Sequence, residues 1–218
     1  MLSLAIQSKT KDRIIDAAVA LFNTKGFNGT SVRDISQKAK VNVANIAYYF
    51  ENKEGLLEHL VTTFLEGYIQ EVEAVITDLE EKGPTECLYK LIQSLLRYHH
   101  EHRHIARFVY REISLDTVLI REIMTTYLTK EKYYLKMVFE QGMKEKAFKK
   151  LNIPYVILQL KGMLSMPYLH PQYLAEVLHV FSHETFFIEQ YTKELENWVH
   201  QVILEPMSER RLYVKMSS

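Results

Sequence analysis

The segment "TSVRDISQKAKVNVANIAYYF" constrains the fold of this chain more than any other. Ser31 and Asp34 have the S-x-x-D spacing of a capping box, which marks the start of a helix. In the stretch that follows, Asn42 can cap a second helix, in which Ile46 and Phe50 share one face at i and i+4. Only about three residues separate the two helices, which is the tight connection of a helix-turn-helix.

Another helix is predicted immediately before this pair. Ile14 and Phe22 lie on one helical face, and Thr10 is placed to cap the beginning of the helix. Gly26 stands where a residue in the left-handed region would end it. Residues 1–54 are therefore expected to form a domain of three helices.

The remainder, residues 55–218, is predicted to be a second domain that is helical throughout. Seven glycines and five prolines are too few for a sandwich of many short strands joined by tight turns. After the Gly-Pro break in "EKGPTE", apolar spacing marks successive helices. The expected ranges are 55–79, 85–101, 103–112, 116–146, 153–166, 172–180 and 184–204. The fold class is all-α, with about nine to ten helices in total.

Composition excludes several other classes of protein. Cys87 is the single cysteine, so an internal disulfide is excluded and a reducing cytoplasm is expected. No apolar run has the length of a membrane span, and the N-terminus lacks the pattern of a signal peptide. Motifs of nucleophilic, nucleotide-dependent and zinc-dependent enzymes are missing, so we expect no enzyme, no cofactor and no membrane partner.

The second helix of the helix-turn-helix carries candidate DNA contacts on its outward face. With Ile46 and Phe50 turned inward, the residues left outside are Val43, Ala44, Asn45, Tyr48 and Tyr49. The first turn of such a helix meets base edges in the major groove, where small side chains and an amide can contact thymine and adenine. Tyrosine hydroxyls farther along can bind phosphates. The alternatives are a tyrosine ring packed inside and a merely hydrated Asn45.

The longer run "TSVRDISQKAKVNVANIAYYFENKEGLL" resembles the DNA-binding signature of the TetR family of bacterial regulators. The resemblance implies a homodimer that binds an inverted repeat of double-stranded DNA, is cytoplasmic and nucleoid-associated, and uses residues 55–218 for regulation and dimerisation. The DNA-binding residues that it implies are Thr30, Ser31, Arg33, Asn42, Val43, Ala44, Asn45, Tyr48, Tyr49 and Lys53. Lys40 departs from the family pattern, where glycine is common, and Ala47 stands where a phosphate-contacting tyrosine is common.

Segments in the second domain, including "FVYREISLD" and "LIREIMTTYLTKEKYY", resemble a TetR-type regulator of the division protein FtsZ in spore-forming bacteria. This likeness implies that the helical body binds FtsZ or another division protein. The candidate partner-binding residues are Arg103, Arg107, Arg111, Glu112, Arg121 and Glu122. The alternative for these residues is a solvated face with local ion pairs.

A conventional repressor is the alternative function, with a small apolar effector in the helical body. The candidate lining is Met137, Phe139, Met143, Met163 and Met166, and plain core packing accounts for the same residues. For dimerisation the candidates are Leu158, Met163, Phe187, Tyr191, Leu195 and Trp198, which core packing explains equally well. The histidines in "RYHHEHRH" do not share one helical face, so no metal site is expected.

Overall fold

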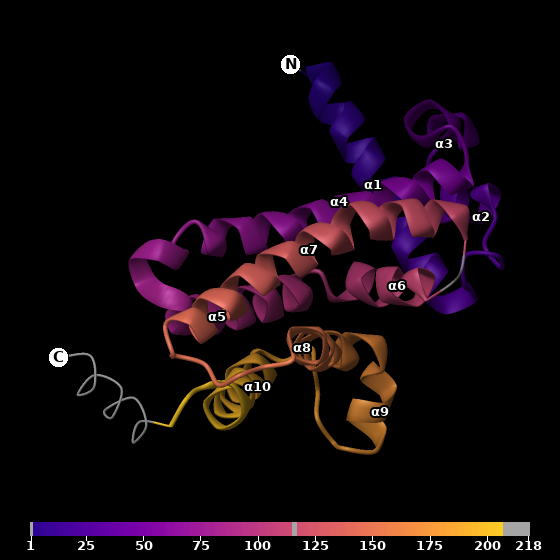
Figure 1. Cartoon of the computed structure of the whole chain (residues 1–218). Helices are drawn as coiled ribbons and strands as arrows, with labels where there is room; N and C mark the ends of the chain where they lie inside the picture. Colours follow the sequence, from indigo (N-terminus) through magenta and orange to yellow (C-terminus); the bar gives the residue numbers. More distant parts are fainter. Residues whose placement is uncertain (1, 115–116, 207–218) are drawn as a thin grey trace. The chain divides into compact units, whose positions relative to one another are not determined.

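The computed structural model of the protein describes residues 2–114 and 117–206, with side chains described from residue 9 (Figure 1). The elements in these ranges are helices, so the all-α fold class is confirmed. They are α1 (Leu2–Lys25), α2 (Val32–Ala39), α3 (Val43–Phe50), α4 (Lys53–Ile76), α5 (Leu79–Glu101), α6 (Arg103–Ile113), α7 (Val118–Lys144), α8 (Ile153–Leu169), α9 (Pro171–Glu176) and α10 (Thr185–Trp198), which continues as a π-helical turn (Val199–Ile203). None of the described helices is long and apolar enough to cross a membrane.

The chain divides into two compact units whose boundary differs from the predicted one at residue 54. The first unit comprises Met1–Glu66 and His102–Ile123, and the second Gly67–Glu101 and Met124–Ser218. Helix α6 joins the first unit because its apolar face packs on α1, where Phe108 stacks on Phe22 with ring centroids 5.0 Å apart. The unit that carries the helix-turn-helix therefore includes a helix from the middle of the chain.

Helix α1 is longer than predicted. It begins at Leu2, so Thr10 lies inside the helix and the predicted cap at this residue is wrong. Residues 2–9 contain no glycine or proline and are mostly good helix formers, which lets the helix continue. Ile14 and Phe22 are fully buried, as predicted. Gly26 ends the helix with a φ of +76°, and its N–H donates to the Phe22 carbonyl at 3.0 Å.

The two helices of the helix-turn-helix begin at the predicted caps. The Ser31 hydroxyl accepts from the Asp34 N–H at 3.1 Å, and the Ser31 N–H donates to the Asp34 carboxylate at 2.9 Å. The Asn42 side chain accepts from the Ala44 N–H at 2.9 Å. These bonds satisfy N–H groups that the first turn of a helix leaves without partners.

The second unit is built around an apolar core supplied by α4, α5, α7, α8 and α10. Its innermost residues include Val72, Leu88, Leu91, Ile92, Leu96, Val138, Phe139, Leu160 and Val199. Helix α5 contains the predicted Gly-Pro break, because Gly83 adopts a φ of +79° and interrupts the helical backbone. Two late helices end earlier than predicted: α9 stops at Glu176, and α10 changes to π-helical geometry after Trp198.

Candidate nucleic-acid interface

The turn between α2 and α3 is held by an arginine from α1. Lys40 ends α2 in the left-handed region, with a φ of 54° and a ψ of 49°. This conformation favours glycine, because it raises the free energy of any residue that has a Cβ atom. Arg13 donates one guanidinium nitrogen to the carbonyls of Ala39 and Lys40, at 2.9 Å in the second case. These bonds stabilise the turn on which the direction of α3 depends.

Helix α3 presents a narrow exposed face of small residues followed by a tyrosine. Val43 is 42% exposed and Tyr48 is 71% exposed, and Ala44 and Ala47 lie between them on the same surface. Asn45 is half-buried. Sequence reasoning missed Ala47 as part of this face, although its position at i+4 from Val43 predicts it.

The two tyrosines differ in their surroundings. Their rings meet edge to face with centroids 4.9 Å apart, and Tyr49 also lies 6.2 Å from the ring of Phe50. Phe50 is buried with Ile46 in the core of the unit, as predicted. Tyr49 is therefore half-buried between the core and Tyr48, which is the ring that faces solvent.

On α2, Arg33 is exposed. Its neighbour Asp34 is engaged elsewhere, with the Ser31 hydroxyl at 2.6 Å and the Lys25 ammonium at 3.2 Å. Hydrogen bonds from the Ser31 side chain and backbone, followed by that from Lys25, lower the pKa of Asp34 to about 2. Asp34 therefore forms its ion pair with Lys25.

Two of the predicted phosphate contacts have internal roles. Thr30 is 2% exposed, and its hydroxyl donates to the Gly26 carbonyl at 2.8 Å. Lys53 is half-buried and donates to the carbonyls of Phe27 and Thr30 at 3.0 and 3.1 Å. Its ammonium also lies 4.3 Å from the centroid of the Phe27 ring. Both residues therefore hold the loop between α1 and α2.

Ser31 and Asn42 are exposed, but their side chains serve as helix caps. Both caps lie at the first turn of a helix, where N–H groups point outward and attract anions. These residues thus define the N-terminal ends of α2 and α3, beside the exposed side chains.

The predicted partner surface on α6 is only partly exposed. Arg111 donates to the Asn23 carbonyl at 3.4 Å, near the C-terminal end of α1. Glu112 is 5% exposed, and burial raises the pKa of its carboxyl. Arg103 and Arg107 are half-buried. Glu112 therefore lies in the interior of its own unit, and the prediction that it is a surface residue is wrong. Arg121 and Glu122, at the start of α7, are exposed.

The predicted dimerisation residues fall into two groups. Leu158 on α8 is 67% exposed, whereas Phe187 and Leu195 on α10 are buried in the second unit. The Tyr191 hydroxyl donates to the Met163 carbonyl at 2.8 Å within the same chain. Trp198 is also packed against the core. Further exposed apolar side chains in the second unit lie outside the predicted set, and they are Tyr155, Met166, Tyr173, Val177, Leu178, Val180, Phe181 and Phe186.

The methionine-rich set is divided between the core of the second unit and its surface. Phe139 is fully buried in the core, and Met137, Met143 and Met163 are packed against that core. Met166 is 38% exposed. Within residues 2–114 and 117–206, no three His, Cys, Asp or Glu side chains are grouped as a metal ion would require. His99 is fully buried and hydrogen-bonds the Leu95 carbonyl at 2.6 Å.

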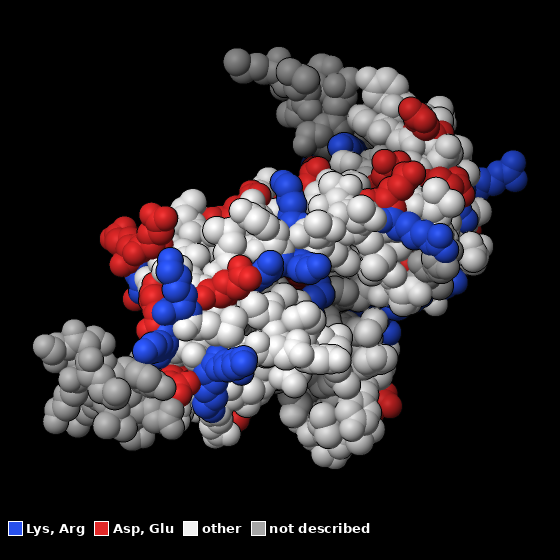
Figure 2. All heavy atoms as spheres, viewed as in Figure 1, with Lys and Arg blue, Asp and Glu red and all other residues white. Residues whose placement is uncertain are grey.

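Charge is mixed over the face of the molecule drawn in Figure 2. Figure 2 shows basic and acidic side chains interspersed over the face in view, without one large field of either sign. This distribution agrees with the formal net charge of zero.

Comparison with known proteins gives a family match in the region of these helices. Residues 14–60 match the family described as "Bacterial regulatory proteins, tetR family". A relative from Bacillus subtilis (strain 168), the "Probable HTH-type transcriptional regulator YttP", is 50% identical over 193 residues. The alignment covers 88% of this chain and 93% of the relative, so the similarity includes both units.

Solved structures share the fold at low sequence identity. The chain is similar to a Clostridium perfringens putative fatty acid metabolism regulator, with a TM-score of 0.72 and 22% identity, covering 88% of this chain and 100% of the other. It is also similar to the TetR family transcriptional regulator PfmR from Thermus thermophilus, with a TM-score of 0.72 and 19% identity, covering 89% and 100%. The arrangement of helices is therefore shared over nearly the whole of each chain.

Proposed function

Because this chain belongs to the TetR family of bacterial regulatory proteins, we propose that it binds inverted-repeat DNA as a homodimer through α3. Its relatives are DNA-binding transcriptional regulators and not enzymes. The observation that carries the proposal is the exposed strip of α3, which begins with Val43 and Ala44 and ends with Tyr48 at 71% exposed. Side chains of this size allow the helix to approach base edges closely.

Each exposed group on α2 and α3 has a proposed role. Val43 and Ala44 contact thymine methyl groups, and Asn45 offers its amide to adenine or to a bridging water. Tyr48 donates its hydroxyl to a phosphate at the edge of the groove, supported by Tyr49. Arg33, exposed on α2, adds a charge at a phosphate or at a guanine.

The proposed dimer would bury the exposed apolar surface of the second unit. Leu158 and Tyr155 are 67% and 64% exposed on α8, and Phe186 at the start of α10 is 65% exposed. Exposed apolar side chains that lie close together mark an interaction surface. Two copies joined through this surface would place two α3 helices on one duplex, about 34 Å apart for half-sites one helical turn apart.

Selection from a pool of random DNA duplexes tests this proposal. We expect the enriched sequences to contain an inverted repeat, and the complex to have the mass of two chains on one duplex. The variant Leu158→Glu should lower the fraction of dimer and the affinity for the full repeat, because it places a charge on the apolar surface. An enriched site without two-fold symmetry, bound by one chain, would contradict the homodimer.

For the helical body we propose a more specific function, which is to bind a protein partner in cell division. Support comes from the likeness of segments in α6 and α7 to a TetR-type regulator of FtsZ, and from the exposure of Arg121 and Glu122. Arg103, at the start of α6, is half-buried and is a further candidate for the partner contact. The charges of the three residues suit a partner with both acidic and basic groups.

Purified FtsZ and the double variant Arg121→Ala/Glu122→Ala test the division role. We expect the native protein to change FtsZ assembly in a sedimentation assay, and the double variant to lose this effect while it keeps its affinity for DNA. If the native protein leaves FtsZ assembly unchanged, the role in division is wrong. An effector-controlled repressor is the second candidate, and a groove in the second unit favours it.

A further inference from the structure

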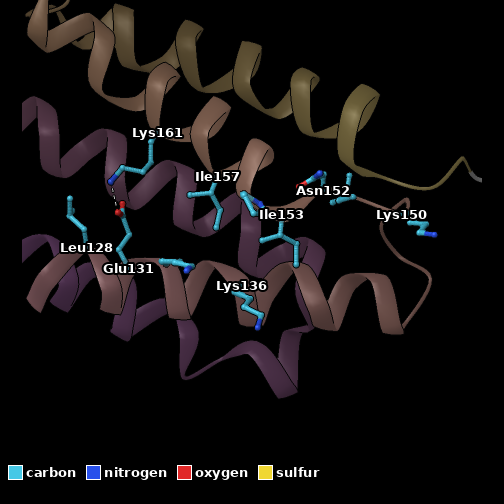
Figure 3. Close-up of a pocket in the computed structure, with 11 residues that line it drawn as sticks. Leu128, Glu131, Lys136, Lys150, Asn152, Ile153, Ile157 and Lys161 are labelled. Atoms are coloured by element: carbon cyan, nitrogen blue, oxygen red, sulfur yellow. Dashed lines mark hydrogen bonds and ion pairs between the residues drawn. The ribbon is translucent and has the colours of Figure 1, made fainter. Parts of the chain in front are cut away.

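A groove of about 890 Å³ lies between α7 and α8 in the second unit, which is a volume typical of small-molecule sites (Figure 3). It lies apart from the methionine-rich set considered above as an effector site. Its walls come from α7, from the connection that follows α7 and from the first half of α8.

The floor of the groove is apolar. Figure 3 shows Ile153 and Ile157 from α8 pointing toward α7, with Leu128 from α7 beyond the Glu131–Lys161 pair, and Leu151 in the connection also lines the groove. All four side chains are half-buried. An apolar chain placed along the groove would remove the remaining surface of these residues from water, which favours binding.

The polar groups that line the groove are mainly basic. Four lysines, Lys132, Lys136, Lys150 and Lys161, accompany one acidic residue, Glu131, so the lining carries a formal net charge of +3. Lys132 and Lys136 are exposed and stand at i and i+4 on α7, where like charges repel. An anion at Lys132 relieves that repulsion.

The single carboxylate of the lining is already neutralised. Glu131 is 1% exposed, accepts the Tyr68 hydroxyl at 2.6 Å and forms an ion pair with Lys161 across the inner end of the groove (Figure 3). Lys136 also contacts Glu140, at 3.4 Å, on the outer side of α7. The inner end therefore offers little charge to a ligand, whereas Lys132 adds an exposed positive charge on the α7 wall.

We propose that this groove binds a long-chain carboxylate of the fatty-acid type. The hydrocarbon chain lies over Ile153 and Ile157, and the carboxylate lies against Lys132 on the α7 wall. The apolar floor selects the chain, and the basic wall selects an anionic head over a neutral or cationic one. This inference deepens the effector-controlled alternative given above, and it names the chemical class of the effector.

Titration calorimetry of the full-length protein tests the proposal with three probes of equal chain length: dodecanoate, dodecanol and dodecyltrimethylammonium, each below its micelle concentration. We expect one dodecanoate per chain, bound at least about tenfold more tightly than the cationic probe, which corresponds to about 1.4 kcal/mol. Equal affinity for the anionic and cationic probes, or no binding of dodecanoate, would overturn the proposal. Binding only to vesicles of anionic lipid would overturn it as well.

Two charge reversals on α7 provide a matched comparison. Lys132→Glu should weaken dodecanoate at least about tenfold and change dodecanol by less than about twofold, because only the head contacts this residue. Lys144→Glu makes the same change on the same helix outside the groove and should leave both affinities unchanged. If the two variants behave alike, the carboxylate does not lie at Lys132.

The DNA affinity of each protein separates this inference from the proposed function. Wild-type protein that binds DNA but not dodecanoate contradicts the groove proposal alone. Protein that binds dodecanoate but not duplex DNA contradicts the DNA-binding proposal and leaves the groove proposal standing. Because Lys132 and Lys144 are exposed, both variants are expected to fold, and circular dichroism checks this.

Discussion

Tyr48 and Tyr49 meet edge to face on α3, with ring centroids 4.9 Å apart and ring planes inclined at 79°. Tyr49 is half-buried and fixes the position of the exposed Tyr48 ring. Adjacent tyrosines on a helix therefore need not be two equal contacts. One ring presents a hydroxyl to solvent, and the other supports it.

Removing the Tyr48 hydroxyl is expected to weaken DNA binding without changing its salt dependence. A hydrogen bond to a charged phosphate is worth about 1.5 kcal/mol and a homodimer loses two, so Tyr48→Phe should lower affinity about 150-fold on specific and unrelated duplexes alike. The slope of log K against log salt stays unchanged, since a neutral hydroxyl releases no counterions. Fluorescence anisotropy at several salt concentrations measures both quantities. An unchanged affinity would mean that this hydroxyl contacts no phosphate.

Arg33→Ala is expected to change the salt dependence that Tyr48→Phe leaves alone. Each phosphate contact contributes about 0.9 to the slope on duplex DNA, so loss of one arginine from each chain of a dimer should reduce it by about 2. The exposed Lys38, on the same helix, supplies the control variant Lys38→Ala. A slope identical to that of the native protein would exclude Arg33 from the phosphate backbone.

Lys53→Met should lower stability rather than the salt slope. The Lys53 ammonium donates to the carbonyls of Phe27 and Thr30 and lies over the Phe27 ring. Loss of two hydrogen bonds from a charged donor is expected to reduce the free energy of unfolding by about 2 kcal/mol. Chemical denaturation measures this change. A stable variant with a reduced salt slope would instead support the phosphate contact that the family resemblance implies.

The capping box makes part of the stability depend on pH. The pKa of Asp34 is about 2 in the folded protein, against an ordinary value of 3.8. A carboxyl whose folded pKa is depressed contributes its stability above the unfolded pKa and loses it as the pH falls through the folded pKa. The stability difference between the native protein and Asp34→Asn should therefore shrink as the pH falls from about 4 to about 2. A difference that stays constant over this range would contradict the capping role of the carboxylate.

The ion pair between the buried Glu131 and the half-buried Lys161 in the second unit can be tested by a double-mutant cycle. Lys161→Met leaves Glu131 buried without its cation and should cost about 3–5 kcal/mol of stability. Adding Glu131→Leu removes the buried charge and should recover most of that loss, although it deprives the Tyr68 hydroxyl of its acceptor. Additive effects of the two substitutions would show that the residues do not interact.

The sequence predicted features that local spacing determines. The caps at Ser31 and Asn42 and the buried pair of Ile46 and Phe50 follow from residue types at fixed intervals, and the structure has them where they were expected. Thr10 was misplaced because a helix without breakers can begin before any capping residue. The local sequence pattern thus predicted the type of each element more reliably than the residue at which the element begins.

Side chains that act at a distance along the chain could not be predicted. Lys53 reaches carbonyls more than twenty residues earlier, and Glu112 is buried in the first unit because α6 packs against α1. Spacing along one helix cannot reveal either contact, since each depends on how separate helices pack. The groove between α7 and α8 was missed for the same reason: its lysines and isoleucines come from two helices and look like ordinary surface in sequence.

Genome-wide mapping of the DNA sites that the protein occupies in cells tests the central claim most directly. The native protein and Tyr48→Ala/Tyr49→Ala would be compared at equal abundance by immunoprecipitation and sequencing. We expect the native protein to occupy sites that share an inverted repeat with half-site centres about one helical turn apart, and the double variant to lose them. Occupied sites without a repeat, or sites that the double variant retains in full, would contradict DNA binding through α3 of a homodimer.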